Sequence, residues 1–319
     1  MTSTEPPDVS AIIPCLNEEE NAAAIAVAVV NQFEMLGLSY EIIFIDNGSI
    51  DDTVKIIKGL CALNPRIRLI VNTRNFGQMR SPTHAIYQAT GSAIIGICAD
   101  FQDPPELIGE FVARWRRGAL IVLGVRQSEK TSWFLRLIRA IGYGFFKRFA
   151  DYRVIPGATG FGLYDRRVVN TLKAWRDPEP FFRGMLVESG FALETVPYKR
   201  PERAGGVSKN SILSLVSFGL SGLASSSKQL LRLPIYIALA IMFTALLTLA
   251  AAIVTIFVGH GAWLLLGLAL TQATFAVLFL FLSLFGEQIR VIHEIARNVP
   301  LVVERERVNF PSPPNDFRR

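Results

Sequence analysis

The sequence predicts a mostly parallel α/β domain joined to a pair of membrane-spanning helices. Within residues 1–205, short apolar runs alternate with helix-like segments, which is the order that a parallel sheet requires. Between Arg232 and Glu287 the chain holds no Asp, Glu, Lys or Arg. The mean hydropathy of +0.34 over 319 residues therefore reflects one apolar segment attached to an ordinary soluble domain.

The expected strands and helices of the domain alternate along the chain. Each strand is a short run of apolar, often β-branched residues, and each helix repeats its apolar positions at helical spacing. We expect strands at residues 9–15, 40–45, 67–71, 93–98 and 120–125, and helices at 21–36, 51–63, 81–90 and from Pro104 onward. Polar residues and glycines collect where these strands end. An open α/β sheet binds its ligand at those ends, so the chemistry is expected there.

Asp46 ends the second expected strand and is followed by Asn47, Gly48 and Ser49. A carboxylate at this point can accept hydrogen bonds from a ribose hydroxyl or from a base N–H. The same residue types also form tight turns and helix caps. The motif alone leaves a binding site and a turn as alternatives.

A second acidic group follows the fourth expected strand. Asp100, Gln102 and Asp103 place several side-chain oxygens close together in the chain. Hard cations such as Mg²⁺ and Mn²⁺ prefer oxygen ligands, and they need few protein carboxylates when phosphate oxygens are also present. A helix N-cap with acidic residues before Pro104 is the structural alternative.

Three other kinds of site find no support in the sequence. The three cysteines are odd in number and form no CxxC pair, which argues against a disulfide scaffold or a structural zinc. The three histidines have no metal-ligand spacing and no evident Asp or Ser partner. The glycine-rich residues 157–162 do not follow the first strand, as a dinucleotide-binding loop would.

The apolar segment divides into two stretches, residues 233–258 and 262–285, each longer than the roughly 20 residues that cross a bilayer. A buried hairpin of a soluble protein is the alternative, but both stretches are apolar on every face. The turn between them has no Lys or Arg, whereas both flanks are basic, which predicts that both termini lie in the cytoplasm. The spans carry no charge, so they suit an anchor in the plasma (inner) membrane rather than an ion pathway.

Two further segments combine apolar helical spacing with basic residues. Residues 132–150 and 212–231 suit helices lying in the lipid headgroup layer, and domain-core helices with a solvated basic face are the alternative. The net charge of +6 beside a membrane segment favours anionic lipid over nucleic acid as a partner. The expected organisation is a cytoplasmic domain at 1–205, a juxtamembrane amphipathic helix at 206–231, two transmembrane helices at 232–286 and a cytoplasmic tail at 287–319.

Four phrases occur in order along the chain: IPCLNEEEN at residues 13–21, IDNGS at 45–49, NFG at 75–77 and ADFQDPPE at 99–106. In this combination the chain resembles the family 2 glycosyltransferases of the GT-A fold. It looks most like the branch that transfers sugars to polyprenyl phosphates, which contains dolichol-phosphate mannose synthase and bacterial undecaprenyl-phosphate sugar transferases. The resemblance covers nearly the whole chain and implies a nucleotide-sugar-binding catalytic domain with a Rossmann-like sheet.

The resemblance also implies roles for individual residues. Pro14 and Glu18 would line the nucleoside pocket, and Asp46 would contact the base or the ribose. Asp100 would bind Mg²⁺ or Mn²⁺, with help from Gln102. The residues that would lie near the donor and lipid phosphates are Arg126, Arg203 and Lys209.

The reaction implied by the resemblance is inverting, metal-dependent transfer of a hexose from a UDP- or GDP-sugar to a polyprenyl phosphate, for cell-envelope glycans or glycolipids. A phosphate monoester has a second pKa of about 6, so the acceptor is an anion near neutral pH and needs no general base. The enzyme has to align it with the anomeric carbon and stabilise the leaving diphosphate. The expected partners are the two substrates and the lipid bilayer, without nucleic acid, and a homo-oligomer is compatible with the sequence.

The chain departs from the family pattern in three places. Cys98 stands at the first acidic position of the DxD motif. Asn47 follows Asp46 where a second acid is usual. Many relatives have an Asp and an Arg within the stretch that corresponds to residues 159–163, where this chain has Gly160 and Gly162. These departures motivate an alternative from another functional class, a catalytically silent relative that binds nucleotide sugar or scaffolds a membrane complex.

Overall fold

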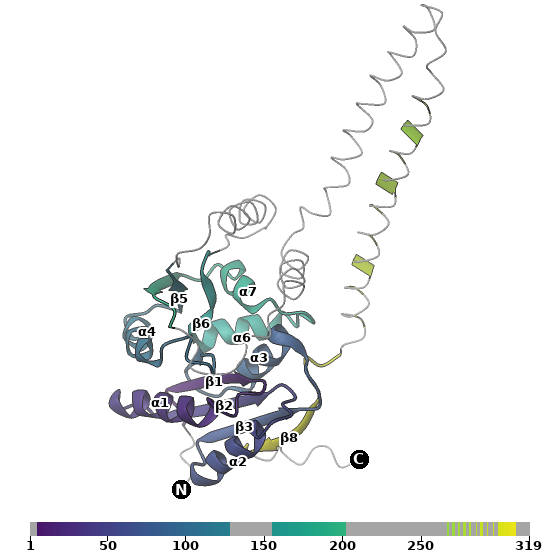
Figure 1. The fold of residues 1–319 in the computed structure, drawn as a ribbon. Coiled ribbons are helices and arrows are strands. Elements are labelled where there is room, and N and C mark those ends of the chain that lie inside the picture. The colour runs from purple at the N-terminus through teal and green to yellow at the C-terminus, as the bar shows by residue number, and fades with distance from the viewer. Residues whose placement is uncertain are drawn as a thin grey trace, which may run out of the picture.

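The computed structural model describes residues 5–127, 155–201 and 299–310, together with scattered helical positions between 267 and 296 (Figure 1). The predicted interfacial helix at 132–150, the juxtamembrane helix at 206–231 and most of the predicted spans lie outside the described residues. In the described part of the chain, no helix has the length and apolar character needed to cross a membrane.

One eight-stranded sheet forms the centre of the domain, with the strand order β7-β5-β6-β4-β1-β2-β3-β8. Its strands are β1 (Val9–Cys15), β2 (Tyr40–Asp46), β3 (Ile67–Asn72), β4 (Ala93–Gly96), β5 (Ile121–Arg126), β6 (Ala158–Asp165), β7 (Leu193–Tyr198) and β8 (Glu304–Val308). Only β6 and β8 of these run antiparallel to their neighbours. The predicted mostly parallel α/β sheet is therefore confirmed.

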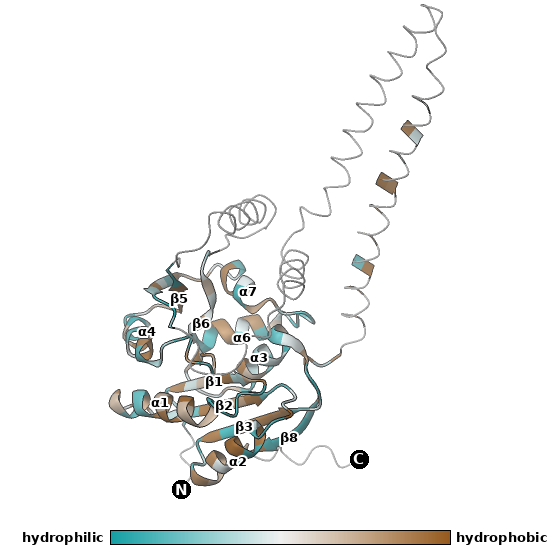
Figure 2. Cartoon of the chain, in the orientation of Figure 1, coloured by the Kyte–Doolittle hydropathy of each residue, from teal (hydrophilic) through white to brown (hydrophobic). Residues whose placement is uncertain are grey.

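Helices cover both faces of the sheet. On one face lie α1 (Ala22–Met35), α2 (Thr53–Leu63) and α4 (Ile108–Arg116), which follows the short helix η1 (Pro105–Leu107); on the other lie α3 (Gly77–Gln88), α6 (Arg166–Ala174) and α7 (Phe182–Glu188). Strand β2 shows why two covers are needed, since Phe44 packs toward α1 and Ile45 toward α3. Each such side chain is fully buried and contributes about 1.5–3 kcal/mol. Figure 2 shows hydrophobic residues along the central strands and a mixture of hydrophobic and hydrophilic residues along the helices.

Strand β6 was not predicted, and it lies between β4 and β5. Glycine is unfavourable inside strands, so the glycine-rich residues 157–162 do not predict a strand. In the structure these glycines let the backbones of β4, β5 and β6 lie close to one another. A Cβ built on Gly162 would lie 2.3 Å from the carbonyl oxygen of Val122, and one on Gly96 would lie 2.9 Å from that of Gly160. Only glycine fits at these two crowded positions.

The C-terminal segment supplies an edge strand, which the predicted tail at 287–319 did not include. Strand β8 pairs with β3, and Figure 1 shows it in yellow beside that strand. The backbone N–H of Thr73 donates to Val303 O at 2.9 Å, and Asn309 donates to the carbonyl of Cys61 at 2.7 Å. Its sequence, ERERV, is charged as exposed edge strands commonly are, which hides it from a search for apolar runs.

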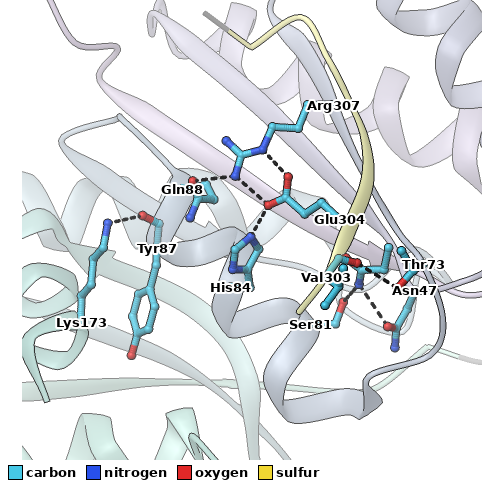
Figure 3. Close-up of polar contacts among 11 residues, drawn as sticks. Asn47, Thr73, Ser81, His84, Tyr87, Gln88, Lys173, Val303, Glu304 and Arg307 are labelled. Atoms are coloured by element: carbon cyan, nitrogen blue, oxygen red, sulfur yellow. Dashed lines mark hydrogen bonds and ion pairs between the residues drawn. The ribbon is translucent and has the colours of Figure 1, made fainter. Parts of the chain in front are cut away.

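An ionic cluster joins β8 to α3 (Figure 3). Glu304 Oε1 contacts His84 Nε2 at 2.5 Å and accepts a hydrogen bond from Arg307 at 2.6 Å, and Arg307 also donates to Gln88 at 3.1 Å. Burial by itself would raise the pKa of Glu304. The contacts with His84 and Arg307 outweigh that effect and lower this pKa to about 2.

Glu304→Gln should weaken the domain most at neutral pH. A carboxyl with a lowered pKa stabilises the fold above its unfolded pKa, near 4.5, and this stabilisation is lost as the pH falls toward about 2. The difference in unfolding free energy between wild type and variant should therefore shrink over that range. Urea denaturation at a series of pH values measures it. If the difference stayed constant down to pH 2, the charge of Glu304 would not be the source of the stabilisation.

Candidate active site

The candidate site lies at the sheet edge where β1, β2, β3 and β4 end. Their parallel alignment brings four connecting segments together, at residues 16–21, 47–52, 73–76 and 97–104. Strand β5 runs in the same direction and ends at Arg126. The structure thus brings the described members of the predicted site to a single edge.

The loops after β1 and β2 hold each other in place. Asn17 N donates to Ser49 Oγ at 2.8 Å, and Ile50 N donates to Asn17 Oδ1 at 2.9 Å. Asn17 has φ 54°, a left-handed conformation that asparagine tolerates better than most residues. Glu18 N donates to Thr53 Oγ1 at 2.8 Å. The predicted nucleoside-pocket residue Glu18 is therefore fixed against the loop that follows Asp46.

Asp46 is fully buried and forms the turn at the end of β2. Its carboxylate accepts hydrogen bonds from the backbone N–H groups of Gly48 and Ser49, both at 3.1 Å. Gly48 has φ 87°, and a Cβ there would lie 3.0 Å from the backbone of Arg74. The turn expected from these residue types is present, and contact of Asp46 with a nucleoside stays a prediction. Pro14, near the end of β1, is half-buried beside the same turn.

Asn47 connects the loop after β2 to the end of β3 and to the loop that follows β3, through its side-chain amide. Its nitrogen donates to Asn75 Oδ1 at 2.8 Å and to Gly77 O at 3.2 Å. Its oxygen accepts from Phe76 N at 2.9 Å and from Asn72 Nδ2 at 3.2 Å. The amide nitrogen donates and the amide oxygen accepts, which a carboxylate at this position could not do. Asn47 therefore holds the loop after β2 against the loop after β3.

Asn47→Asp should lower the free energy of unfolding by about 1–3 kcal/mol, because a carboxylate cannot donate to the two oxygens that the amide now serves. Urea denaturation of the purified chain measures the change. Asn31→Asp is the matched control, since Asn31 is exposed on α1 and its substitution should cost less than about 0.5 kcal/mol. Equal effects of the two substitutions would remove the bracing role.

The loop after β4 presents Asp100 and Gln102. Gln102 N donates to Asp100 Oδ1 at 3.2 Å, and both side chains are half-buried. Between them Phe101 adopts φ 58°, an unfavourable conformation for an aromatic residue, and its ring packs against the hydrophobic core. Backbone strain of this kind typically costs about 1–3 kcal/mol and gathers at functional sites.

Cys98 lies at the start of the same loop. Burial, followed by the nearby carboxylates of Asp103 and Asp100, raises the pKa of its thiol well above the usual value. These surroundings favour the neutral thiol over the thiolate. Within residues 5–127, 155–201 and 299–310, no cluster of three His, Cys, Asp or Glu side chains could hold a metal by itself. The half-buried side chains on this loop that carry oxygen atoms are Asp100 and Gln102, and their role as metal ligands stays a prediction.

Asp103 does not join Asp100 as an exposed oxygen ligand, as the sequence suggested, because it is 1% exposed. It accepts hydrogen bonds from Cys98 N at 3.2 Å and from Tyr198 Oη at 2.9 Å. The predicted phosphate-binding residue Arg126 donates to Tyr198 Oη at 3.1 Å and lies 3.6 Å from the Asp103 carboxylate. Sequence reasoning missed Tyr198, which carries no local signal.

The remaining predicted positions give less information. Arg203 and Lys209 lie outside the described residues. Gly160 has φ 94°, and its carbonyl oxygen accepts a hydrogen bond from Tyr164 Oη. Among the described residues, a Cβ at Gly160 would meet no atom within 4 Å.

Known proteins resemble this chain over most of its length. The glycosyl transferase family 2 model matches residues 10–172. An uncharacterized glycosyltransferase, YkcC, of Bacillus subtilis is 28% identical over 92% of both chains. A prophage bactoprenol glucosyl transferase homolog of Escherichia coli is 33% identical over 81% of both chains.

Among solved structures, glucosyl-3-phosphoglycerate synthase from Mycobacterium tuberculosis, in complex with Mn²⁺, UDP and phosphoglyceric acid, is 16% identical over 68% of this chain and 76% of its own, with a TM-score of 0.49. A likeness this distant says nothing about the activity. The family model and the relatives above 30% identity are decisive. The chain belongs to glycosyl transferase family 2 and is a glycosyltransferase with a GT-A-like α/β fold.

Proposed function

We propose that the protein transfers a sugar from a UDP- or GDP-sugar to a polyprenyl phosphate, with inversion at the anomeric carbon. The observation that carries the proposal is the 33% identity, over 81% of the chain, to a relative named for bactoprenol glucosyl transfer. The site at the sheet edge agrees with it, because Arg126, together with a divalent cation on the side-chain oxygens of Asp100 and Gln102, would suit a diphosphate better than a neutral ligand.

The residues fit a hard divalent cation. Mg²⁺ and Mn²⁺ bind to proteins through one or two carboxylates and complete their ligands with phosphate oxygens and water. Asp100 and Gln102 offer such a partial set on one strained turn. Asp100, assisted by Gln102, would hold the ion. A bound cation would neutralise part of the charge of the leaving diphosphate.

The chain's own residues then bind and align the substrates. The acceptor phosphate oxygen attacks the anomeric carbon, the bond from that carbon to the diphosphate breaks, and the leaving diphosphate takes the electron pair. Arg126 would stabilise that diphosphate through charge-assisted hydrogen bonds. We assign Arg203 and Lys209 to the lipid phosphate, and Pro14, Glu18 and Asp46 to the nucleoside.

A membrane anchor is part of the proposal, because the acceptor is a lipid. Residues 233–286 carry no Asp, Glu, Lys or Arg. Helical positions within the second apolar stretch also expose their side chains; Leu278, Phe281 and Phe285 are 43–57% exposed. Large apolar groups exposed together are typical of surfaces that meet lipid or protein. We place the protein in the plasma membrane, with the catalytic domain and both termini in the cytoplasm.

Transfer of label from a panel of radiolabelled UDP- and GDP-sugars into organic-extractable polyprenyl phosphate tests the proposal. The purified full chain is assayed with Mg²⁺ or Mn²⁺, and with EDTA as the control. We expect metal-dependent label from one donor. Label only in water-soluble or polymeric products would contradict the lipid acceptor. Binding of a nucleotide sugar without any transfer would favour the catalytically silent relative, which the departure at Gly160 motivates.

A further inference from the structure

We infer that Asp103 and Tyr198 are positioning residues that orient Arg126 toward the donor diphosphate and join it to the loop carrying Asp100. The inference rests on the proposed function, since it concerns how that site binds its donor. Neither residue is expected to touch the substrate. Asp103 is 1% exposed and Tyr198 is 5% exposed, so both act through the groups that they hold.

The first step of the argument is the chain of contacts. Arg126 Nε donates to Tyr198 Oη at 3.1 Å, and Tyr198 Oη donates to Asp103 Oδ1 at 2.9 Å. The other carboxylate oxygen, Oδ2, accepts from Cys98 N at 3.2 Å. One carboxylate thereby connects the end of β5, the end of β7 and the start of the loop after β4.

The second step is rigidity. The ring of Tyr198 packs edge-to-face on Phe161, with centroids 5.5 Å apart. Gly124 lies against both rings, since a Cβ there would come within 2.7 Å of the Phe161 ring and within 3.1 Å of the Tyr198 ring. The tyrosine therefore has little freedom to rotate, and its hydroxyl is held at a defined point. Positioning residues work in this way when packing restricts their rotamers.

The third step is charge. Burial raises the pKa of Tyr198 to about 12, with a further contribution from Asp103, so the hydroxyl keeps the proton that it donates. Burial would lower the pKa of Arg126, but Tyr198 and Asp103 outweigh it and raise that pKa. The Asp103 carboxylate is balanced by the guanidinium at 3.6 Å. The positive charge of Arg126 thus offsets the negative charge of the buried Asp103. The Arg126 side chain is 23% exposed, so it still reaches the surface.

A double-mutant cycle tests the inference with the full chain in detergent. Tyr198→Phe removes both hydrogen bonds of the hydroxyl and keeps the ring. We expect it to weaken UDP or GDP binding, measured by calorimetry, about 10- to 100-fold, as loss of a supporting partner commonly does. Arg126→Lys should weaken binding at least as much. Because Tyr198 acts through Arg126, the double variant should bind little worse than Arg126→Lys alone. Additive losses would overturn the inference.

Asp103→Asn provides a second variant should Tyr198→Phe fold poorly. Its amide N–H₂ would have to face either the Cys98 N–H or the Tyr198 hydroxyl, so donor binding should again fall about 10-fold or more. Unchanged binding by Asp103→Asn would overturn the inference as well. Tyr40→Phe is the matched control, because Tyr40 is buried at the start of β2 and, within the described part of the chain, its hydroxyl accepts only a long 3.4 Å hydrogen bond from Asn64. It should leave nucleotide binding unchanged.

The outcomes separate this inference from the proposed function. If the wild-type chain binds neither UDP nor GDP, or if Arg126→Lys binds as the wild type does, the assignment of Arg126 to the diphosphate is wrong. If Arg126→Lys loses affinity and Tyr198→Phe does not, the site assignment stands and the positioning role fails. Thermal unfolding of every variant identifies losses that come from misfolding.

Discussion

Asp100→Asn should lower the rate of sugar transfer on the order of 10²- to 10³-fold, the usual cost of losing one group that stabilises charge in a transition state. The substitution keeps the size of the side chain and its acceptor for Gln102 N, so the loop should persist. What it removes is the negative charge that attracts a divalent cation. The variant should therefore need a higher Mn²⁺ concentration for half-maximal activity, and its maximal rate should be lower. A Mn²⁺ titration of initial rates measures both.

The control for this experiment is Asp52→Asn. Asp52 lies on the same sheet edge at the start of α2, but its side chain is 65% exposed and pairs with Lys55 at 3.7 Å. Its substitution should change neither the rate nor the Mn²⁺ dependence by more than about twofold, as for other exposed surface groups. If Asp100→Asn kept both the rate and the metal dependence of the wild type, Asp100 would not be the metal-binding residue.

The parallel strands could be predicted because they are buried on both faces. In β2 every residue is buried, and such strands stand out as continuous apolar runs. The site edge followed from them, because parallel strands place their carboxyl ends together. The prediction of Asp46 and Asp100 at one edge needed no contact information, whereas Arg126 was named only through the family resemblance.

The residues that support the site could not be predicted in the same way. Asp103 and Tyr198 are 95 positions apart, and their contact exists only because β7 pairs with β5. Strand β8 joins β3 from more than 230 residues away and carries few apolar side chains. Strand β6 depends on glycines, which are useful there for close approach and are poor signals of a strand. The Asp103–Tyr198 contact, strand β8 and strand β6 all depend on pairing between segments far apart in the chain, which local sequence patterns do not reveal.

Glu41→Gln should strongly destabilise the domain. Glu41 lies near the start of β2, at the edge opposite the candidate site, and is 2% exposed. Its Oε1 accepts hydrogen bonds from Ser10 Oγ at 2.6 Å and from Thr90 N at 2.5 Å, while Oε2 pairs with Arg68. Ser10 in turn accepts from Gly91 N at 2.8 Å. The carboxylate thus joins β1, β2, β3 and the end of α3.

Glu41→Gln removes the negative charge that pairs with the Arg68 guanidinium. Breaking a buried pair in this way typically costs about 3–5 kcal/mol, and the low end applies because the Arg68 side chain is 19% exposed. An amide in place of the carboxylate also presents an N–H group to donors that need an acceptor. We therefore expect Glu41→Gln to lower the free energy of unfolding by about 3 kcal/mol. Urea denaturation of the detergent-solubilised chain measures the loss.

Glu306→Gln separates burial from charge pairing as the cause. Glu306 forms an ion pair with Lys58 at 2.7 Å, a good contact by distance, but both side chains are more than 40% exposed. Water already solvates these charges, so the variant should lose only about 0–1 kcal/mol. Similar losses from Glu41→Gln and Glu306→Gln would show that the buried network adds nothing beyond a surface ion pair. Because Glu41 lies far from the strand ends that carry Asp100, the folded fraction of Glu41→Gln should transfer sugar at the wild-type rate.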